Sequence, residues 1–136
     1  MSIRQSTKQS EHDAAISAAK QIYENKGKYV WTNPGSQKNK TWNGRYIDVI
    51  AAESAEATRA WVIEVETDDS VSESEARDQW QDYDEVYQGR WYLVVPRDSK
   101  EKAEQLMKKH GISHCRVITW TRNPNGLHSF WGLPGL

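Results

Sequence analysis

Apolar and polar residues repeat with two different periods along the chain, and these periods predict both helices and strands. Segments with an apolar stripe at helical spacing end at glycines or begin at Ser and Asp residues, as helices commonly do. Short apolar runs lie between these segments. The predicted elements, in chain order, are helix 11–26, strands 29–32, 46–51 and 61–67, helix 72–87, strand 91–95, a helix between 98 and 111, and strand 115–120.

This order of elements predicts an α/β fold. A strand followed by a helix and another strand favours parallel pairing, so we expect a mixed central sheet flanked by helices. The 136 residues suffice for one domain that buries about two-thirds of its unfolded surface. We expect residues 1–9 to be a flexible N-terminus. The apolar tail, 121–136, is expected to pack on the domain or on a second copy of the chain in a homodimer.

Composition narrows the class of protein. Hydrophobic residues make up 37% and charged residues 27%, which is typical of a globular protein and not of a disordered one. No apolar run approaches about 18 residues and no basic leader opens the chain, so we expect no membrane span, no signal peptide and a cytoplasmic location. Cys115 is the only cysteine, which excludes an internal disulfide. With a formal net charge of −1, a nucleic acid would need a local basic patch.

Carboxylates interrupt the two central strands. Glu64 and Glu66 fall on the same side of strand 61–67, and Asp48 lies in the middle of the apolar run 46–51. An ionised carboxylate is costly to bury unless it is paired or binds a metal. If the segment between the strands is a hairpin turn, Asp48 lies near both glutamates. The pattern therefore predicts a site of oxygen ligands for a hard divalent cation.

A resemblance to a known family rests on five segments, which are helix 11–26, the loop Pro34-Gly35-Ser36, Ile47-Asp48, the strand Ile63-Glu64-Val65-Glu66 and helix 72–87. In this order they resemble the PD-(D/E)xK nuclease superfamily, which has the restriction-endonuclease-like fold. Archaeal-type Holliday junction resolvases are the most similar members, because they too have a Gly-Ser loop after the first strand. The resemblance covers about residues 11–96. It implies a nuclease that hydrolyses phosphodiester bonds of DNA, endonucleolytic or resolvase-like, with Mg²⁺ or Mn²⁺ as cofactor.

The resemblance implies particular roles for the acidic residues. Asp48 and Glu64 match the family's metal-binding carboxylates, and the main-chain carbonyl of Val65 matches a further ligand. Glu66 stands where the family usually has a lysine. A glutamate there favours a second divalent ion or a carboxylate base, and some restriction endonucleases with Glu-x-Glu are active. We therefore expect Asp48, Glu64 and Glu66 to be catalytic.

Residues outside the acidic strands complete the implied site. Gln79 and Tyr83 match the Gln-x-x-x-Tyr spacing of RecB-type members, with Gln79 in a catalytic role and Tyr83 at the substrate strand. Ser36 matches a loop serine that contacts the phosphate. Glu11 is the candidate for an additional metal ligand from the first helix, and His12 is its alternative.

The loop after the first strand supplies the expected nucleic-acid contact. Lys38 and Lys40 are the clustered positive charges nearest to the predicted site, and Trp42 follows them. A basic, aromatic loop suits a phosphate backbone with a stacked base. The expected partner is nucleic acid, DNA before RNA, whereas branched and linear substrates are equally compatible with the sequence.

Other interpretations of the same residues are open. Glu64 and Glu66 have an alternative in ion pairs with Arg45, Arg59 or a lysine. Two functions other than catalysis are also compatible with the sequence. A catalytically degenerate nuclease-fold domain would bind nucleic acid or a protein partner, and Glu66 in the lysine position favours it. A dimeric interaction module would be organised by the apolar tail.

Overall fold

A six-stranded mixed sheet organises the chain, in a computed structural model that describes residues 6–136. Its strands lie side by side in chain order: β1 Tyr29–Thr32, β2 Val49–Ala52, β3 Trp61–Val65, β4 Trp91–Pro96, β5 Cys115–Arg122 and β6 His128–Trp131. The β3–β4 and β4–β5 pairs are parallel, and the other neighbours are antiparallel. The predicted α/β fold with a mixed sheet is confirmed.

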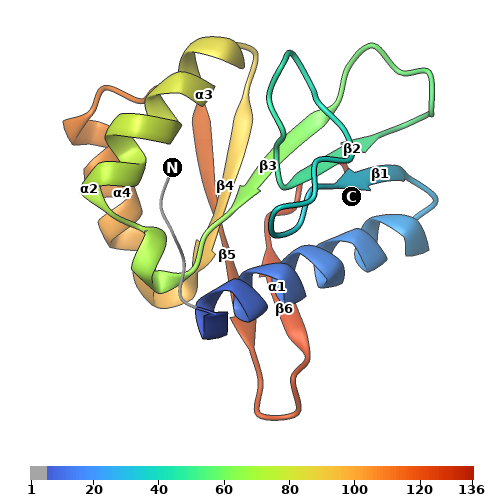
Figure 1. Cartoon of the computed structure of the whole chain (residues 1–136), viewed down its shortest axis with the longest axis horizontal. Coiled ribbons are helices and arrows are strands. Elements are labelled where there is room, and N and C mark those ends of the chain that lie inside the picture. Colours follow the sequence, from blue (N-terminus) through green and yellow to red (C-terminus); the bar gives the residue numbers. More distant parts are fainter. Residues whose placement is uncertain (1–5) are drawn as a thin grey trace.

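Helices cover both faces of the sheet (Figure 1). They are α1 Ser6–Asn25, α2 Glu73–Glu75, the π-helical segment η2 Ala76–Trp80, α3 Gln81–Val86 and α4 Lys100–Lys109, with short 3-10 turns η1 Asp68–Ser70 and η3 Arg97–Ser99. Helix α1 packs on one face of the sheet, whereas α2, η2, α3 and α4 pack on the other. Both faces of the central strands are therefore buried, which explains the continuous apolar run of β4.

Two hydrophobic cores result from this arrangement. Ile16 and Tyr23 of α1 pack against Ile63 and Val65 of β3. The core on the opposite face contains the largest apolar side chains, among them Trp80, Tyr83, Tyr87, Trp91, Leu93 and Leu106. The predicted stripe of helix 72–87 thus faces this second core. The Ser72 hydroxyl accepts the main-chain N–H of Glu75 at 3.3 Å, so Ser72 is the N-cap of this helix.

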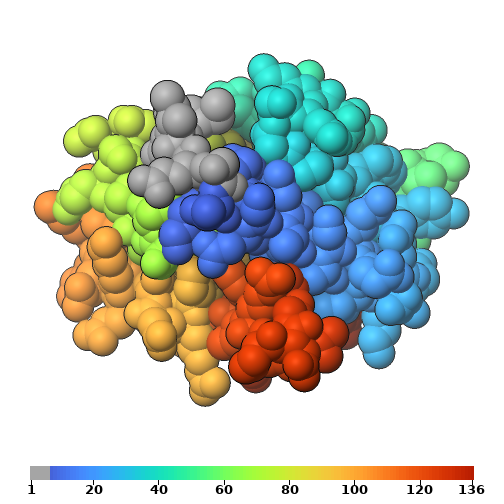
Figure 2. Space-filling view, turned by 60° about the horizontal axis from the view of Figure 1, so that its bottom comes forward, coloured from blue at the N-terminus to red at the C-terminus, as the bar shows by residue number. Residues whose placement is uncertain are grey.

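The ends of the chain differ from expectation. Residues 6–9 belong to α1 and are not a flexible segment; residues 1–5 lie outside the described part. The tail adds a strand that the sequence pattern did not predict, because β6 pairs with β5 in the register Thr119↔Trp131. Figure 2 shows this hairpin beside α1, and the Tyr23 hydroxyl donates to the main-chain oxygen of Pro134 at 2.7 Å. The tail therefore packs on its own domain. Within residues 6–136, no helix has the length and apolar character needed to cross a membrane.

Candidate functional site

The antiparallel pairing of β2 and β3 brings Asp48 and Glu64 together. The register Val49↔Ile63 places Asp48, one residue before β2, opposite Glu64. The main-chain N–H of Asp48 donates to Glu64 Oε1 at 3.1 Å, and the N–H of Val65 donates to Asp48 Oδ2 at 2.8 Å. Asp48 is 8% exposed and Glu64 5%. We call these two side chains the acidic pair.

Within residues 6–136, no lysine or arginine forms an ion pair with either carboxylate. Arg45 instead binds Asp82 with distances of 2.7 and 2.9 Å. The basic group next to the pair is the imidazole of His12, a buried residue of α1 whose Nε2 lies 3.0 Å from Asp48 Oδ2. Within the described residues, the pairing of Glu64 with Arg45, Arg59 or a lysine, considered as an alternative to metal binding, is therefore absent.

The electrostatic state of Glu64 follows from its surroundings. Burial raises the pKa of Glu64 well above its ordinary value, and the negative charges of Asp48 and Glu66 and a hydrogen bond with Asp48 raise it further. Two carboxylates that share a buried site repel each other when both are ionised. A proton or a cation between them removes this repulsion.

The acidic pair opens into a pocket of about 360 Å³. Its walls come from α1, from the loop after β1 and from the helix after β3, and they include Gln9, His12, Asn33, Ser36, Lys38, Tyr46, Glu75, Gln79 and Tyr83. Of the predicted site residues, this pocket unites Asp48, Glu64, Gln79, Ser36, Lys38 and Tyr83. Residues far apart in the sequence thus form one polar cavity around the acidic pair, which we call the acidic pocket.

Asn33 shapes the loop that carries Ser36 and Lys38. Its Oδ1 accepts the N–H groups of Asn39 at 2.7 Å and Lys40 at 2.9 Å, and its Nδ2 donates to the main-chain oxygen of Ile47 at 2.6 Å. The loop is thereby tied to the residue that precedes Asp48. The ammonium of Lys38 lies 5.6 Å from the ring centroid of Tyr46, at the edge of the acidic pocket.

Glu75, Gln79 and Tyr83 form a polar row at intervals of four residues on the helix. The hydrogen-bond network orients the Gln79 amide with its nitrogen 3.2 Å from Glu64 Oε2 and 2.6 Å from Glu75 Oε2, and its oxygen accepts the Tyr83 hydroxyl at 3.1 Å. Burial, followed by the charges of Glu64 and Asp48, raises the pKa of Tyr83, so the phenol remains a proton donor. Sequence reasoning missed Glu75, although its spacing from Gln79 and Tyr83 was a usable signal.

Glu66 does not join the acidic pair. It is fully buried, and its Oε2 accepts the indole N–H of Trp80 at 3.2 Å instead of lining the acidic pocket. The three acids that we expected to converge therefore do not. In the part of the chain that the structure describes, no three His, Cys, Asp or Glu side chains gather as a metal site.

Glu11 and Lys40 also lie elsewhere. Glu11 pairs with Lys8 at 3.1 Å and lines a different cavity, so the residue of α1 that reaches Asp48 is His12. The structure thus does not bring Glu11 to the acidic pair, because its side chain lies on the neighbouring face of the helix. Lys40 packs over the ring of Trp31, 5.2 Å from its centroid, and is absent from the walls of the acidic pocket.

The donor set of the acidic pair suits a hard divalent ion. Two adjacent carboxylates without a lysine or arginine partner among residues 6–136 offer oxygen ligands, and the peptide group of Val65 lies beside them. Comparison of the chain with protein-family models, with curated proteins and with solved structures gives no match. The chemistry of the acidic pocket therefore carries the functional inference.

Proposed function

We propose that this chain is a metal-dependent nuclease of the PD-(D/E)xK type, with a restriction-endonuclease-like fold, that hydrolyses phosphodiester bonds of DNA. One observation supports the proposal above all others: a buried pair of carboxylates without lysine or arginine partners among residues 6–136 opens into a polar pocket beside Lys38. A divalent cation bound between the two carboxylates would remove their mutual repulsion.

Asp48 and Glu64 would hold Mg²⁺ or Mn²⁺, together with the main-chain carbonyl of Val65. The ion would polarise the phosphate and lower the pKa of a bound water. His12 and the N–H of Val65 hold Asp48 in place, and the amide of Gln79 holds Glu64.

Other residues of the acidic pocket would bind the substrate and move the proton. Lys38 and Ser36 would contact the phosphate, and the Tyr83 hydroxyl, which donates to the Gln79 amide oxygen in this structure, would turn to donate its proton to a substrate oxygen. Glu75 is the third carboxylate of this pocket and takes the role of proton acceptor that we expected for Glu66.

A second candidate is a degenerate domain that binds nucleic acid without cutting it. The observation that favours it is the position of Glu66. The family usually has a lysine there to assist the attacking water, whereas the Glu66 carboxylate is bound to Trp80 beneath the acidic pocket.

Cleavage assays separate the two candidates. Supercoiled and branched DNA would be incubated with wild type, Asp48→Asn and Glu64→Gln in Mg²⁺ and in Mn²⁺. Glu85→Gln, which removes one exposed carboxylate from α3, is the matched control. We expect nicking by wild type and by the control, and a loss of at least 100-fold in both site variants. Absence of nicking by wild type in both metals would reject the nuclease and leave the degenerate domain.

A further inference from the structure

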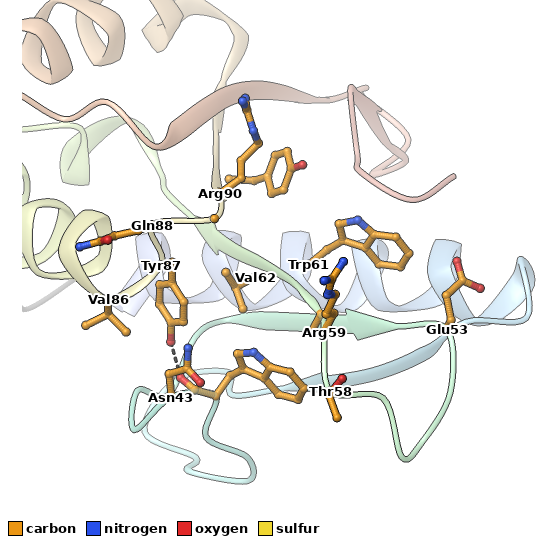
Figure 3. A pocket seen from close by; sticks show the side chains of 14 residues that line it. Asn43, Glu53, Thr58, Arg59, Trp61, Val62, Val86, Tyr87, Gln88 and Arg90 are labelled. Carbon is orange, nitrogen blue, oxygen red and sulfur yellow. Dashed lines mark hydrogen bonds between the residues drawn. The ribbon is translucent and has the colours of Figure 1, made fainter.

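A second and larger pocket, of about 740 Å³, lies at the opposite end of β3 from Glu64 (Figure 3). Its walls come from the segment before β3, the end of α3 and the start of β4. The lining residues include Trp42, Glu53, Arg59, Trp61, Val62, Tyr87, Arg90 and Tyr92. We call it the aromatic pocket. Neither the proposed hydrolysis nor the packing of the core requires this cavity.

The aromatic pocket has an excess of positive charge. Arg59 and Arg90 are exposed, and neither makes an ion pair or a side-chain hydrogen bond within residues 6–136. Glu53 is the carboxylate among the lining residues, and both its oxygens already accept from Lys28 at 2.9 and 3.0 Å. Among residues 6–136, these two arginines thus have no carboxylate partner, although the formal net charge of the chain is −1. An exposed guanidinium group without a carboxylate partner favours an anion, above all a phosphate.

Flat aromatic side chains line the same cavity. Trp42 packs on the α3 side of the sheet, and Trp61 and Tyr92 pack on the α1 side; all three are half-buried, so part of each ring remains accessible. Rings of this kind stack on nucleobases with little dependence on the base. The chemical class that suits both the rings and the arginines is a nucleotide, in which a planar base is attached to a phosphate.

Trp42 is held in position by a tight turn. Its N–H donates to the main-chain oxygen of Arg45 at 2.9 Å, and the N–H of Arg45 donates back at 3.2 Å. Between them, Asn43 and Gly44 have φ values of 51° and 81°, as a two-residue hairpin turn of this kind requires. The Tyr87 hydroxyl also donates to the Trp42 carbonyl (Figure 3). A ring on a rigid turn loses little entropy on binding.

The part of the aromatic pocket around Trp42 and Tyr87 lies on the same face of the sheet as Tyr83 of the acidic pocket. The loop between β1 and β2 contributes Ser36 and Lys38 to one and Trp42 to the other. Val62 of the aromatic pocket and Glu64 of the acidic pocket are two residues apart on β3, so they share a face of the sheet, about 7 Å apart at about 3.3 Å per residue. About two nucleotides of a stacked strand, at about 3.4 Å each, span this distance. A single strand can therefore occupy both pockets.

We propose that the aromatic pocket binds an unpaired nucleotide of a single-stranded nucleic acid, with the base against the Trp42 ring and neighbouring phosphates at Arg59 and Arg90. This inference deepens the proposed nuclease function and rests on it for its biological meaning. It implies that the acidic pocket acts on nucleic acids with an unpaired segment, such as a tail, a flap or a loop. A free mononucleotide has the same chemistry, and the experiment separates the two sources.

Binding is measured in EDTA, so that no cleavage contributes. Fluorescence anisotropy of a labelled oligothymidylate of about a dozen nucleotides compares wild type with the double variant Arg59→Gln/Arg90→Gln. The control is Arg77→Gln/Arg116→Gln, which removes two exposed arginines outside both pockets and changes the net charge equally. We expect Kd to rise at least tenfold in the first double variant and less than threefold in the control. The salt slope of the affinity should fall by about 0.7 for each lost phosphate contact.

Two further probes test the base and the source of the ligand. An abasic strand of equal length should bind at least tenfold more weakly than the oligothymidylate and should leave tryptophan fluorescence unquenched. If the ligand is a nucleic-acid strand, thymidine monophosphate should bind far more weakly than the oligothymidylate. Equal affinity would identify a site for a free mononucleotide and would refute the proposal of a strand-binding site.

The outcomes for this pocket and for the nuclease are separable. The inference would be overturned if both double variants bound the oligothymidylate equally well, or if wild type bound the abasic strand as tightly as the oligothymidylate. Either result would count even if wild type nicks DNA. Arginine-dependent strand binding by a protein that does not nick DNA would reject the nuclease and retain the nucleotide site.

Discussion

Replacing Asp48 with asparagine removes one charge from the acidic pair and keeps its main hydrogen bond. The new amide oxygen can still accept the N–H of Val65, which donates to Asp48 Oδ2 at 2.8 Å. Most substitutions destabilise a protein by about 0.5–3 kcal/mol. In the absence of metal we expect the opposite here, because Asp48→Asn removes the repulsion between two buried carboxylates.

The size of this gain follows from the electrostatics of the pair. Two unit charges about 4 Å apart interact by about 4 kcal/mol at an effective dielectric constant of about 20. The protein already avoids part of this repulsion, since the raised pKa of Glu64 favours its protonated form. If about a quarter of the repulsion remains, Asp48→Asn gains about 1 kcal/mol in the free energy of unfolding. In a chain of this length this corresponds to about 3–4 °C in Tm.

Metal should reverse the order of stability. At ten times its Kd, a divalent ion stabilises the wild type by about 1.4 kcal/mol, and it does not stabilise a variant that has lost a ligand. Thermal unfolding would be followed in EDTA and in Mg²⁺ or Mn²⁺ for wild type, Asp48→Asn and the control Glu85→Gln. We expect Asp48→Asn to have the higher Tm in EDTA and the lower Tm in saturating metal.

Two results would refute this reasoning. A loss of about 2 kcal/mol or more in EDTA is the value expected for breaking a buried hydrogen bond to a charged group, and it would show that Asp48 stabilises the fold. An equal rise of Tm with metal in wild type and Asp48→Asn would place the ion at another site.

Two further predictions concern stability. Burial alone would raise the pKa of Asp84, but hydrogen bonds from two main-chain N–H groups before β5 and from the Trp91 indole hold this pKa below its ordinary value. The stability that Asp84 contributes is therefore present above a pH of about 4 and is lost as the pH falls through the pKa of the folded state. Asp84→Ala should lose about 2 kcal/mol in urea unfolding at pH 7 and clearly less at pH 3, and an equal loss at both would contradict this. Gly135→Ala would place a Cβ 2.6 Å from the Trp61 ring, whereas Gly27→Ala has a similar positive φ and open space. Calorimetry should show about 1 kcal/mol lost for Gly27→Ala and about 1–3 kcal/mol more than this for Gly135→Ala, and equal losses would mean that the tail does not pack tightly against Trp61.

The sequence by itself determined the local elements and the acidic pair. The helices and strands follow from the periods of apolar residues, which involve only residues close together in the chain. The same holds for the Ser72 cap and for the position of Gln79 and Tyr83 on one face of a helix. Asp48 and Glu64 met as predicted because a short connection between two strands leaves little choice but antiparallel pairing, and the two-residue period then sets which side chains share a face.

Only the tertiary structure decided which residues surround that pair. The rotation of α1 on the sheet brings His12 and not Glu11 to Asp48, and the packing of Trp80 directs Glu66 away from the acidic pocket. The pairing of β6 with β5 and the aromatic pocket likewise depend on segments distant in sequence. Periodicity specifies which residues share a face of one element, but the free energy of packing between elements specifies what that face contacts.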